Sequence, residues 1–147
     1  MGKKRIVKKR GESVEEQIQA RIAKARAKSS KKKLHSALVH ISSSYNNTLI
    51  ALTDEEGNAV FQSSSGALGF RGSKKGTPYA ATRAAEDVAS FAQQLGVKDI
   101  DIRIKGIGSG RETVIRFFVQ KGFNVRSIKD LTPIPHGIPR LPKPRRV

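Results

Sequence analysis

Residues 78–95 constrain the fold of this chain more than any other segment. Small apolar residues recur there at steps of three and four, so they share one face of a helix. They are Ala81, Ala84, Ala85, Val88, Ala89, Ala92 and Leu95. Thr77 is a favourable N-cap, Pro78 suits the first helical position, and Gly96 suits the end of the helix. Because alanines dominate this face, the helix is expected to lie close against a β-sheet.

Strand signals surround this helix. Three segments with β-strand composition precede it, joined by turn residues, and two follow it. They are residues 34–41, 48–54, 59–63, 99–105 and 124–130. In residues 99–105, Ile100, Ile102 and Ile104 alternate with charged side chains that are expected to face outward. A second helix carrying Val114 and Phe118 separates the last two strands. The order βββαβαβ predicts an α/β fold with a mixed β-sheet.

The charge of the chain is concentrated at its ends. The net charge is +17; residues 1–33 hold 13 basic and 3 acidic side chains, and residues 131–147 hold 4 and 0. We therefore expect three parts: a basic N-terminal extension over residues 1–33, a globular α/β domain over residues 34–130, and a basic, Pro-rich C-terminal tail over residues 131–147. A capping-box spacing within the extension predicts a short helix over residues 13–28. This excess of positive charge suits a polyanionic partner.

Composition excludes several classes of protein. Cysteine is absent, which argues against a disulfide framework and a thiolate zinc site. No apolar run has the ~20 residues of a membrane-spanning helix, so no membrane partner is expected. The basic N-terminus lacks the apolar stretch of a signal peptide, and its three glutamates disfavour an organelle transit peptide. A cytoplasmic location is expected.

Two Gly-rich segments lead into the two predicted helices. Residues 69–76 are expected to form a flexible, cationic loop with Arg71, Lys74 and Lys75, and the free amides of the following helix start would face the same side. Residues 106–112 form the second segment. Neither matches a dinucleotide or P-loop motif, so no nucleotide cofactor and no small-molecule substrate are expected. Arg111 at a helix start is unfavourable unless an anion lies beside it, which favours a nucleic-acid phosphate.

The acidic and histidine residues do not form a catalytic pattern. The carboxylates that could hold a metal are Asp54, Glu86, Asp87, Asp99, Asp101 and Glu112, and most of them read as solvent-facing charges. Asp99 and Asp101 could converge on one face, but no third ligand has a clear spacing, so no metal site is predicted. His40 is expected on the strand face opposite Val39 and Ile41. The Asn46–Asn47 turn has two open interpretations: its amides satisfy the local backbone, or they face a nucleic-acid backbone with Tyr45. Aromatic residues are only 5% of the chain, which disfavours a base-stacking platform.

Four separated motifs together resemble the family of small-subunit ribosomal protein eleven, bacterial type. They are Tyr-Asn-Asn-Thr at residues 45–48, Gly-Phe-Arg-Gly-Ser at 69–73 with Thr-Pro at 77–78, the Gly-rich segment at 105–112, and Asp-Leu-Thr-Pro-Ile-Pro-His-Gly at 130–137 followed by Arg-Arg-Val at 145–147. The resemblance covers about residues 34–147. One departure is that Gly137 directly follows His136, where the family typically has Asn; residues 138–141 differ too.

This resemblance implies a ribonuclease H-like fold without catalysis, in the platform of the small ribosomal subunit. The implied partners are small-subunit ribosomal RNA, neighbouring platform proteins and, near the exit site, messenger RNA. The residues expected to contact ribosomal RNA are Asn46, Asn47, Arg71, Ser73, Lys74, Lys75, Lys105, Arg111, His136, Arg140, Lys143, Arg145 and Arg146. A DNA-compacting or regulatory protein is the alternative that charge alone allows, and a nuclease is a third.

Overall fold

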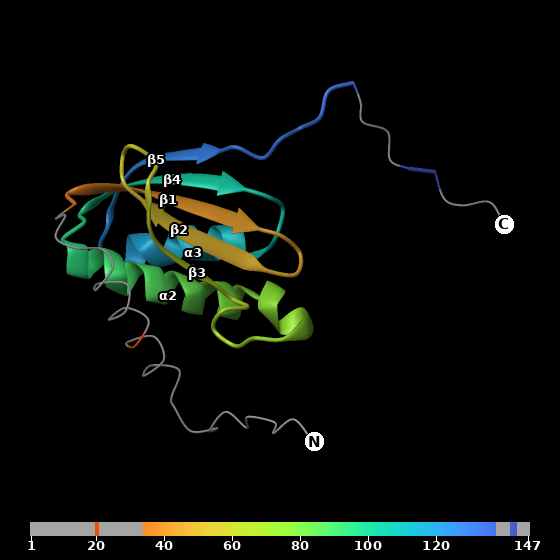
Figure 1. The fold of residues 1–147 in the computed structure, drawn as a ribbon, viewed down its shortest axis with the longest axis horizontal. Helices are drawn as coiled ribbons and strands as arrows, with labels where there is room; N and C mark the ends of the chain where they lie inside the picture. Colours follow the sequence, from red (N-terminus) through yellow and green to blue (C-terminus); the bar gives the residue numbers. More distant parts are fainter. Residues whose placement is uncertain (1–19, 21–33, 138–141, 144–147) are drawn as a thin grey trace, which may run out of the picture.

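A computed structural model describes residue 20, residues 34–137 and residues 142–143. In this part of the chain, five strands form one sheet with two α-helices against it (Figure 1). The elements are β1 (Ser36–Ser43), β2 (Thr48–Thr53), β3 (Ala59–Ser64), the 3₁₀ helix η1 (Gly72–Gly76), α2 (Pro78–Leu95), β4 (Asp99–Lys105), α3 (Gly110–Gln120) and β5 (Asn124–Asp130). The predicted α/β class and the order βββαβαβ are confirmed. The helix predicted over residues 13–28 lies outside the described residues, except for Ala20.

The sheet is mixed, with strand order β3-β2-β1-β4-β5. β1 pairs antiparallel with β2 and parallel with β4; β2 pairs antiparallel with β3, and β4 pairs parallel with β5. The carboxyl ends of β1, β4 and β5 therefore meet at one edge, which we call the C-edge. The β1–β2 turn and the segment after β3 lie at the same edge, because Ser43 pairs with Thr48 and Leu49 with Ser64.

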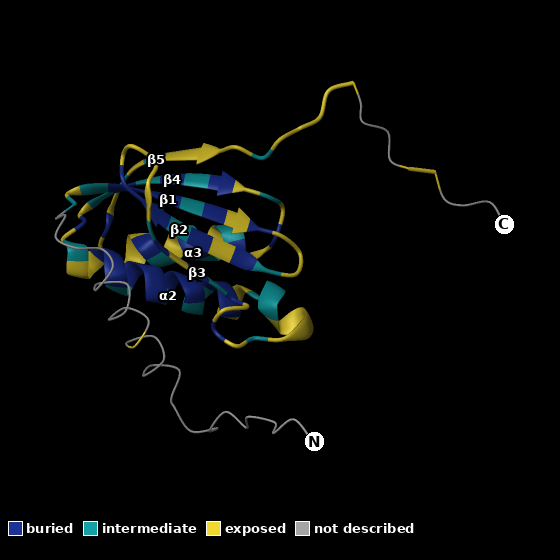
Figure 2. Ribbon diagram, in the orientation of Figure 1, coloured by how far each residue is buried: buried dark blue, intermediate teal, exposed yellow. Residues whose placement is uncertain are grey.

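The core lies between one face of the sheet and the helices (Figure 2). Val39, Ile50 and Ile102 are fully buried on the sheet side, and for Ile102 this was predicted from the alternation in residues 99–105. The alanine face of α2 is buried against β2 and β3, and the helix also buries Phe91, which stacks on Phe61 with 4.5 Å between ring centroids. The alanines let α2 approach the sheet closely, and the ring of Phe91 fills the space between the helix and β3.

The structure corrects the sequence-based interpretations of residues 72–76 and of Asp87. Residues 72–76 form the 3₁₀ helix η1 rather than a flexible loop. Asp87, which was expected to face solvent, is fully buried on α2 and accepts a 2.6 Å hydrogen bond from the hydroxyl of Ser63 on β3. The Asp87 carboxylate therefore joins α2 to the sheet, in keeping with the rule that buried polar groups are hydrogen-bonded.

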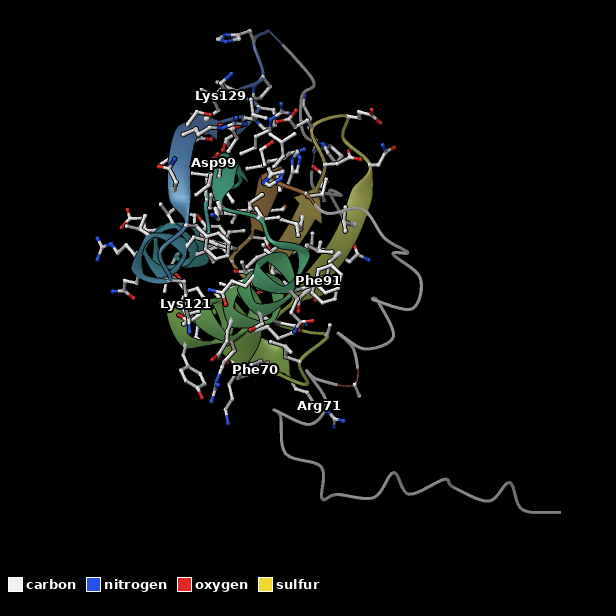
Figure 3. The ribbon with its side chains drawn as sticks, turned by 90° about the vertical axis from the view of Figure 1, so that its left-hand side faces the viewer. Phe70, Arg71, Phe91, Asp99, Lys121 and Lys129 are labelled. Carbon is white, nitrogen blue, oxygen red and sulfur yellow. The ribbon has the colours of Figure 1, made fainter. Side chains whose placement is uncertain are left out.

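The opposite face of the sheet is not covered by a helix in the described residues. α2 and α3 both lie on one side of the sheet, and no helix in residues 34–137 lies on the other (Figures 1 and 3). We call this second side the outer face; it includes His40 on β1, Arg103 on β4 and Lys129 on β5. His40 lies opposite the buried Val39 and Ile41, as predicted. Among the described helices, none is both long and apolar enough to cross a bilayer.

Candidate nucleic-acid interface

Four segments that are distant in sequence meet at the C-edge. They are the β1–β2 turn at residues 44–47, the segment between β3 and α2 at residues 65–77, the β4–α3 loop at residues 106–109, and the chain after β5 from residue 131. Figure 1 shows all four beyond the arrowheads of β1, β4 and β5. These are the four segments that carry the motifs identified in the sequence. The sheet topology therefore brings the motifs together.

Direct hydrogen bonds join these segments to one another. The Gly66 amide donates to Oδ1 of Asn47 at 3.2 Å, which ties the segment after β3 to the β1–β2 turn. The hydroxyl of Ser109 donates to the carbonyl of Gly76 at 3.2 Å, which links the β4–α3 loop to η1. The Gly106 amide donates to Oγ1 of Thr132 at 3.1 Å and connects that loop to the tail. The four segments form one continuous surface.

Glycines make this close approach possible. A Cβ atom on Gly76 would lie 2.1 Å from the carbonyl oxygen of Tyr45, and one on Gly108 would lie 2.3 Å from that of Ser44. On Gly110 a Cβ would lie 2.5 Å from Oγ1 of Thr48. Backbone and buried groups cannot move aside easily, so any larger residue would push the segments apart. The second Gly-rich segment thus has a structural reason that does not depend on a ligand.

Cationic side chains lie on and beside η1. Arg71 and Lys74 are exposed, with Ser73 between them, and Lys75 is half-buried. Within residues 34–137, none of these three cations forms an ion pair with an acidic side chain. An external anion can therefore reach them without displacing an internal partner.

The start of α2 differs from the sequence-based expectation. Thr77 caps the helix as predicted, since its Oγ1 accepts a 3.3 Å hydrogen bond from the Ala80 amide. The Ala81 amide donates to the carbonyl of Thr77 at 3.1 Å, and Pro78 has no amide hydrogen. Few amides are left to face an anion here, so the predicted phosphate contact rests on the side chains of Arg71, Lys74 and Lys75 and stays a prediction.

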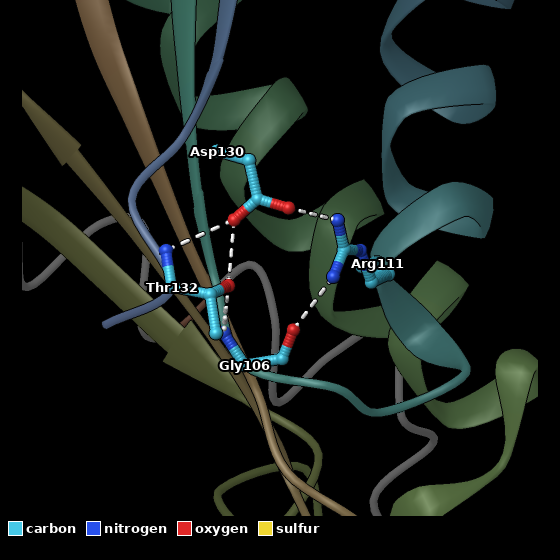
Figure 4. Close-up of polar contacts among 4 residues, drawn as sticks. All are labelled: Gly106, Arg111, Asp130 and Thr132. Carbon is cyan, nitrogen blue, oxygen red and sulfur yellow. Dashed lines mark hydrogen bonds and ion pairs between the residues drawn. The ribbon is translucent and has the colours of Figure 1, made fainter. Parts of the chain in front are cut away.

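Arg111 has an anion beside it, and that anion belongs to the chain itself. Its guanidinium pairs with the carboxylate of Asp130 and donates to the carbonyl of Gly106 at 2.8 Å (Figure 4). The unfavourable position of Arg111 at a helix start therefore does not require an external phosphate, which corrects the sequence argument. Contact between Arg111 and RNA stays a prediction, because the side chain remains partly exposed.

Asp130 organises the beginning of the tail. Its Oδ1 accepts a 2.6 Å hydrogen bond from the Thr132 hydroxyl and a 2.9 Å bond from the Thr132 amide. These bonds, followed by the Arg111 guanidinium, lower the pKa of Asp130 from 3.8 to about 2. A sequence gives no sign of this cluster, because Arg111 and Asp130 are 19 residues apart and only the pairing of β5 with β4 brings them together.

The low pKa of Asp130 is testable by NMR. We expect its carboxyl group to titrate at about pH 2, and the pKa to rise in Thr132→Ala, because the hydroxyl hydrogen bond is the largest cause of the shift. A carboxyl whose pKa is lower in the folded state stabilises the fold above pH 4, and this contribution is lost as the pH falls from about 4 through 2. An unchanged pKa in Thr132→Ala would contradict the hydrogen bond; Thr113→Ala serves as the control.

In the Asn46–Asn47 turn, one asparagine satisfies the local backbone and the other is free to face a nucleic acid. Asn47 has a structural role. Its side-chain oxygen accepts a hydrogen bond from the Gly66 amide, and its backbone amide donates to the hydroxyl of Ser44 at 3.1 Å. Asn46 and Tyr45 are exposed, and Tyr45 has 76% of its surface free. Nothing prevents these two side chains from meeting a partner, so contact of Asn46 with RNA stays a prediction.

The remaining predicted contacts lie along β4 and the tail. Lys105 is exposed at the last residue of β4, and His136 is exposed in the tail. Lys143 is exposed as well. Arg140, Arg145 and Arg146 lie outside the described residues. The structure therefore groups Asn46, Lys105 and the η1 cations at the C-edge, with the tail leaving from the same place.

The carboxylates show no catalytic arrangement. In residues 34–137, no group of three or more acidic or histidine side chains is placed to hold a metal ion. Asp99 accepts from Asn124 at 2.7 Å, and Asp101 accepts from Arg126 at 2.5 Å and from Ser127 at 2.7 Å. These carboxylates are engaged in cross-strand contacts between β4 and β5.

Comparison with known proteins agrees with the motifs. Residues 37–146 match the family model described as "Ribosomal protein S11". The chain is also similar to the "Small ribosomal subunit protein uS11" of Solibacter usitatus (strain Ellin6076), at 47% identity over 135 residues, which cover 86% of this chain and the whole of that protein. The match runs from the second residue of β1 through β5 and extends into the tail. This chain therefore belongs to the ribosomal protein S11 family.

Proposed function

We infer that the protein is a structural constituent of the small ribosomal subunit and that it binds small-subunit ribosomal RNA through the C-edge. Membership of the S11 family supports the role as a structural constituent of the small subunit and the binding of ribosomal RNA. The protein acts as a structural component and not as an enzyme. Its partners include ribosomal RNA and other proteins of the small subunit, and its location is the ribosome.

The observation that carries the C-edge proposal is the meeting of four motif segments around cations with no internal partner. Arg71, Lys74, Lys75 and Lys105 lie on adjoining segments, and the described acidic residues leave all four unpaired. Phosphate oxygens are the complementary groups on RNA, and such contacts position a protein on its RNA without reading base sequence. Binding is then driven by release of counterions from the RNA.

Finer features of the function are also part of the proposal. We place the protein in the platform of the subunit, near the messenger path at the exit site, with neighbouring platform proteins and messenger RNA as further contacts. Arg140, Lys143, Arg145 and Arg146 continue the positive charge along the tail, and we propose that they follow ribosomal RNA. The proposed division is an extension at residues 1–33, a domain at 34–130 and a tail at 131–147. A cytoplasmic ribosome is proposed rather than an organelle one.

The salt dependence of RNA binding tests the C-edge. In Lys74→Gln with Lys75→Gln, the slope of log K against log salt should fall by about 1.4–1.8, because each phosphate contact contributes about 0.7–0.9. The matched control is Lys98→Gln with Lys121→Gln, which removes the same charge at the opposite edge of the sheet, where β4 begins and α3 ends. Filter binding to folded small-subunit ribosomal RNA measures both slopes. An unchanged slope in the first variant would exclude η1 from the interface.

A DNA-binding protein is the alternative from another class, and competition separates the two. Folded ribosomal RNA should displace duplex DNA from the protein at moderate salt, since the described part of the C-edge consists mainly of loops and the five-residue η1 rather than a recognition helix. Preference for duplex DNA would overturn the proposal. Cosedimentation of the protein with small subunits after a high-salt wash gives an independent check.

A further inference from the structure

We propose that the outer face of the sheet is a second binding surface for RNA phosphates, centred on Arg103, Lys105 and Lys129. It deepens the proposed function and rests on it, because the RNA that would reach this surface is the one held at the C-edge. None of Arg103, Lys129 and His40 belongs to the motifs that identify the family.

Strand register places these side chains together. His40 on β1 pairs with Arg103 on β4, and Arg103 pairs with Lys129 on β5, so the three residues form one row across the sheet. Neighbouring strands lie about 4.8 Å apart, and residues two positions apart on a strand lie about 6.6 Å apart. Lys105 is two positions beyond Arg103 on β4 and faces the same way. In Figure 3, Lys129 lies on the side of the sheet away from α2.

The described acidic residues of the outer face form no ion pair with this cluster, although the charge of Lys129 contributes to lowering the pKa of Asp101. Asp101 is held by Arg126 and Ser127, and Arg126 also lies 3.7 Å from a carboxylate oxygen of Glu55. These contacts occupy the half of the face where β4 begins. Toward the C-edge, Arg103, Lys105 and Lys129 form no ion pair with any residue of the described part of the chain.

His40 lies beside the positive charge of Arg103 in this row. Burial and then the charge of Arg103 lower the pKa of His40. Neutral Ala51 lies on the other side of His40, on β2. The imidazole is therefore neutral at physiological pH, and the row carries its charge on Arg103 and Lys129.

RNA fits this surface better than a protein partner does. The nearest neighbours of the cations on β1 are the polar His40 and Ser42, and beyond them β2 contributes Ala51 and one exposed apolar side chain, Leu49. Protein interfaces instead have an apolar core enriched in aromatic residues. No aromatic side chain of β1–β5 lies on this face, so stacking of bases is not supported and contact with the phosphate backbone is. Lys105 adjoins the C-edge, which makes the two surfaces continuous.

A charge-matched pair of variants tests the proposal. In Arg103→Gln with Lys129→Gln, the salt slope of binding to folded small-subunit ribosomal RNA should fall by about 1.4–1.8. Lys98→Gln with Lys121→Gln is the control of equal net charge and should retain the wild-type slope. Circular dichroism verifies that each variant is folded. Equal effects of the two variants, or no effect of either, would overturn the proposal.

A footprint on the unmodified protein gives a second measurement that does not depend on folding of a variant. Bound ribosomal RNA should protect Lys129 from acylation by at least severalfold, while Lys98 remains reactive; protection of Lys105, which adjoins both surfaces, is expected from either one. If Lys74 and Lys75 are protected and Lys129 is not, the outer face does not bind RNA, although the C-edge proposal stands. If Lys74, Lys75, Lys105 and Lys129 all remain reactive, both proposals fail.

Discussion

Replacement of Gly106 by alanine is expected to lower the free energy of unfolding by about 3–5 kcal/mol, since two separate penalties combine there. Gly106 has φ +100, a backbone conformation that side chains other than glycine rarely adopt. A Cβ atom at this position would also lie 2.1 Å from the carbonyl oxygen of Ser43. That oxygen belongs to the last residue of β1, which pairs with Thr48 of β2, and it accepts a 3.0 Å hydrogen bond from the Gly108 amide, so it is held in place.

Two other glycines separate these penalties. Gly122 has φ +83 with no atom within 4 Å of the added Cβ, so Gly122→Ala carries only the backbone strain, about 1–3 kcal/mol. Gly108 has no such φ, but its Cβ would lie 2.3 Å from the carbonyl oxygen of Ser44, so Gly108→Ala carries only the steric penalty, about 1–3 kcal/mol. Urea denaturation of all three variants measures the effects. If Gly106→Ala lost no more than Gly122→Ala, the close approach to β1 would be refuted.

The expected loss at Gly106 bears on RNA binding as well as on stability. Its carbonyl accepts a hydrogen bond from Arg111 and its amide donates to Thr132, so the residue holds the start of α3 and the tail next to β1. A shift of this loop would move Lys105 relative to η1. The spacing of cations along the C-edge thus depends on a residue with no charge.

Local patterns predicted the elements whose signals are periodic. α2 occupies residues 78–95 and β5 residues 124–130, as expected, because a helical repeat with caps and a run of strand residues are complete within their own segments. The alternation of β4 placed Ile100, Ile102 and Ile104 in the core for the same reason. The motifs also indicated which segments would form the candidate site.

Long-range contacts were beyond such patterns. Asp87 is an acidic residue on a helix, and nothing nearby in sequence shows that Ser63, 24 residues earlier, supplies its hydrogen bond. The partner of Arg111 depends on the order of strands in the sheet, so the sequence left its anion open. η1 has five residues, too few for a period to emerge. The cationic row of the outer face likewise requires the register of three strands.

Phe91 shows how a periodic pattern can identify a helix and miss its largest contribution to the core. The sequence argument used the alanines of α2, yet Phe91 is fully buried and stacks on Phe61 of β3 at an interplanar angle of 17°. We expect Phe91→Ala to lower the free energy of unfolding by about 3–5 kcal/mol through the lost transfer energy and the cavity left behind. This is a large share of the 5–15 kcal/mol typical of a domain.

Controls on the same helix make the Phe91 result specific. Tyr79→Ala removes an aromatic ring that is 61% exposed on the first turn of α2, so its cost should stay within about 1 kcal/mol. A double-mutant cycle of Phe91→Leu with Phe61→Leu isolates the ring pair, for which we expect about 0.5–1.5 kcal/mol of coupling. Urea denaturation measures all of these variants. If Phe91→Ala lowered the free energy of unfolding by less than about 1 kcal/mol, α2 would not pack on β3 through this ring, because removing a phenylalanine from a filled core costs more than that.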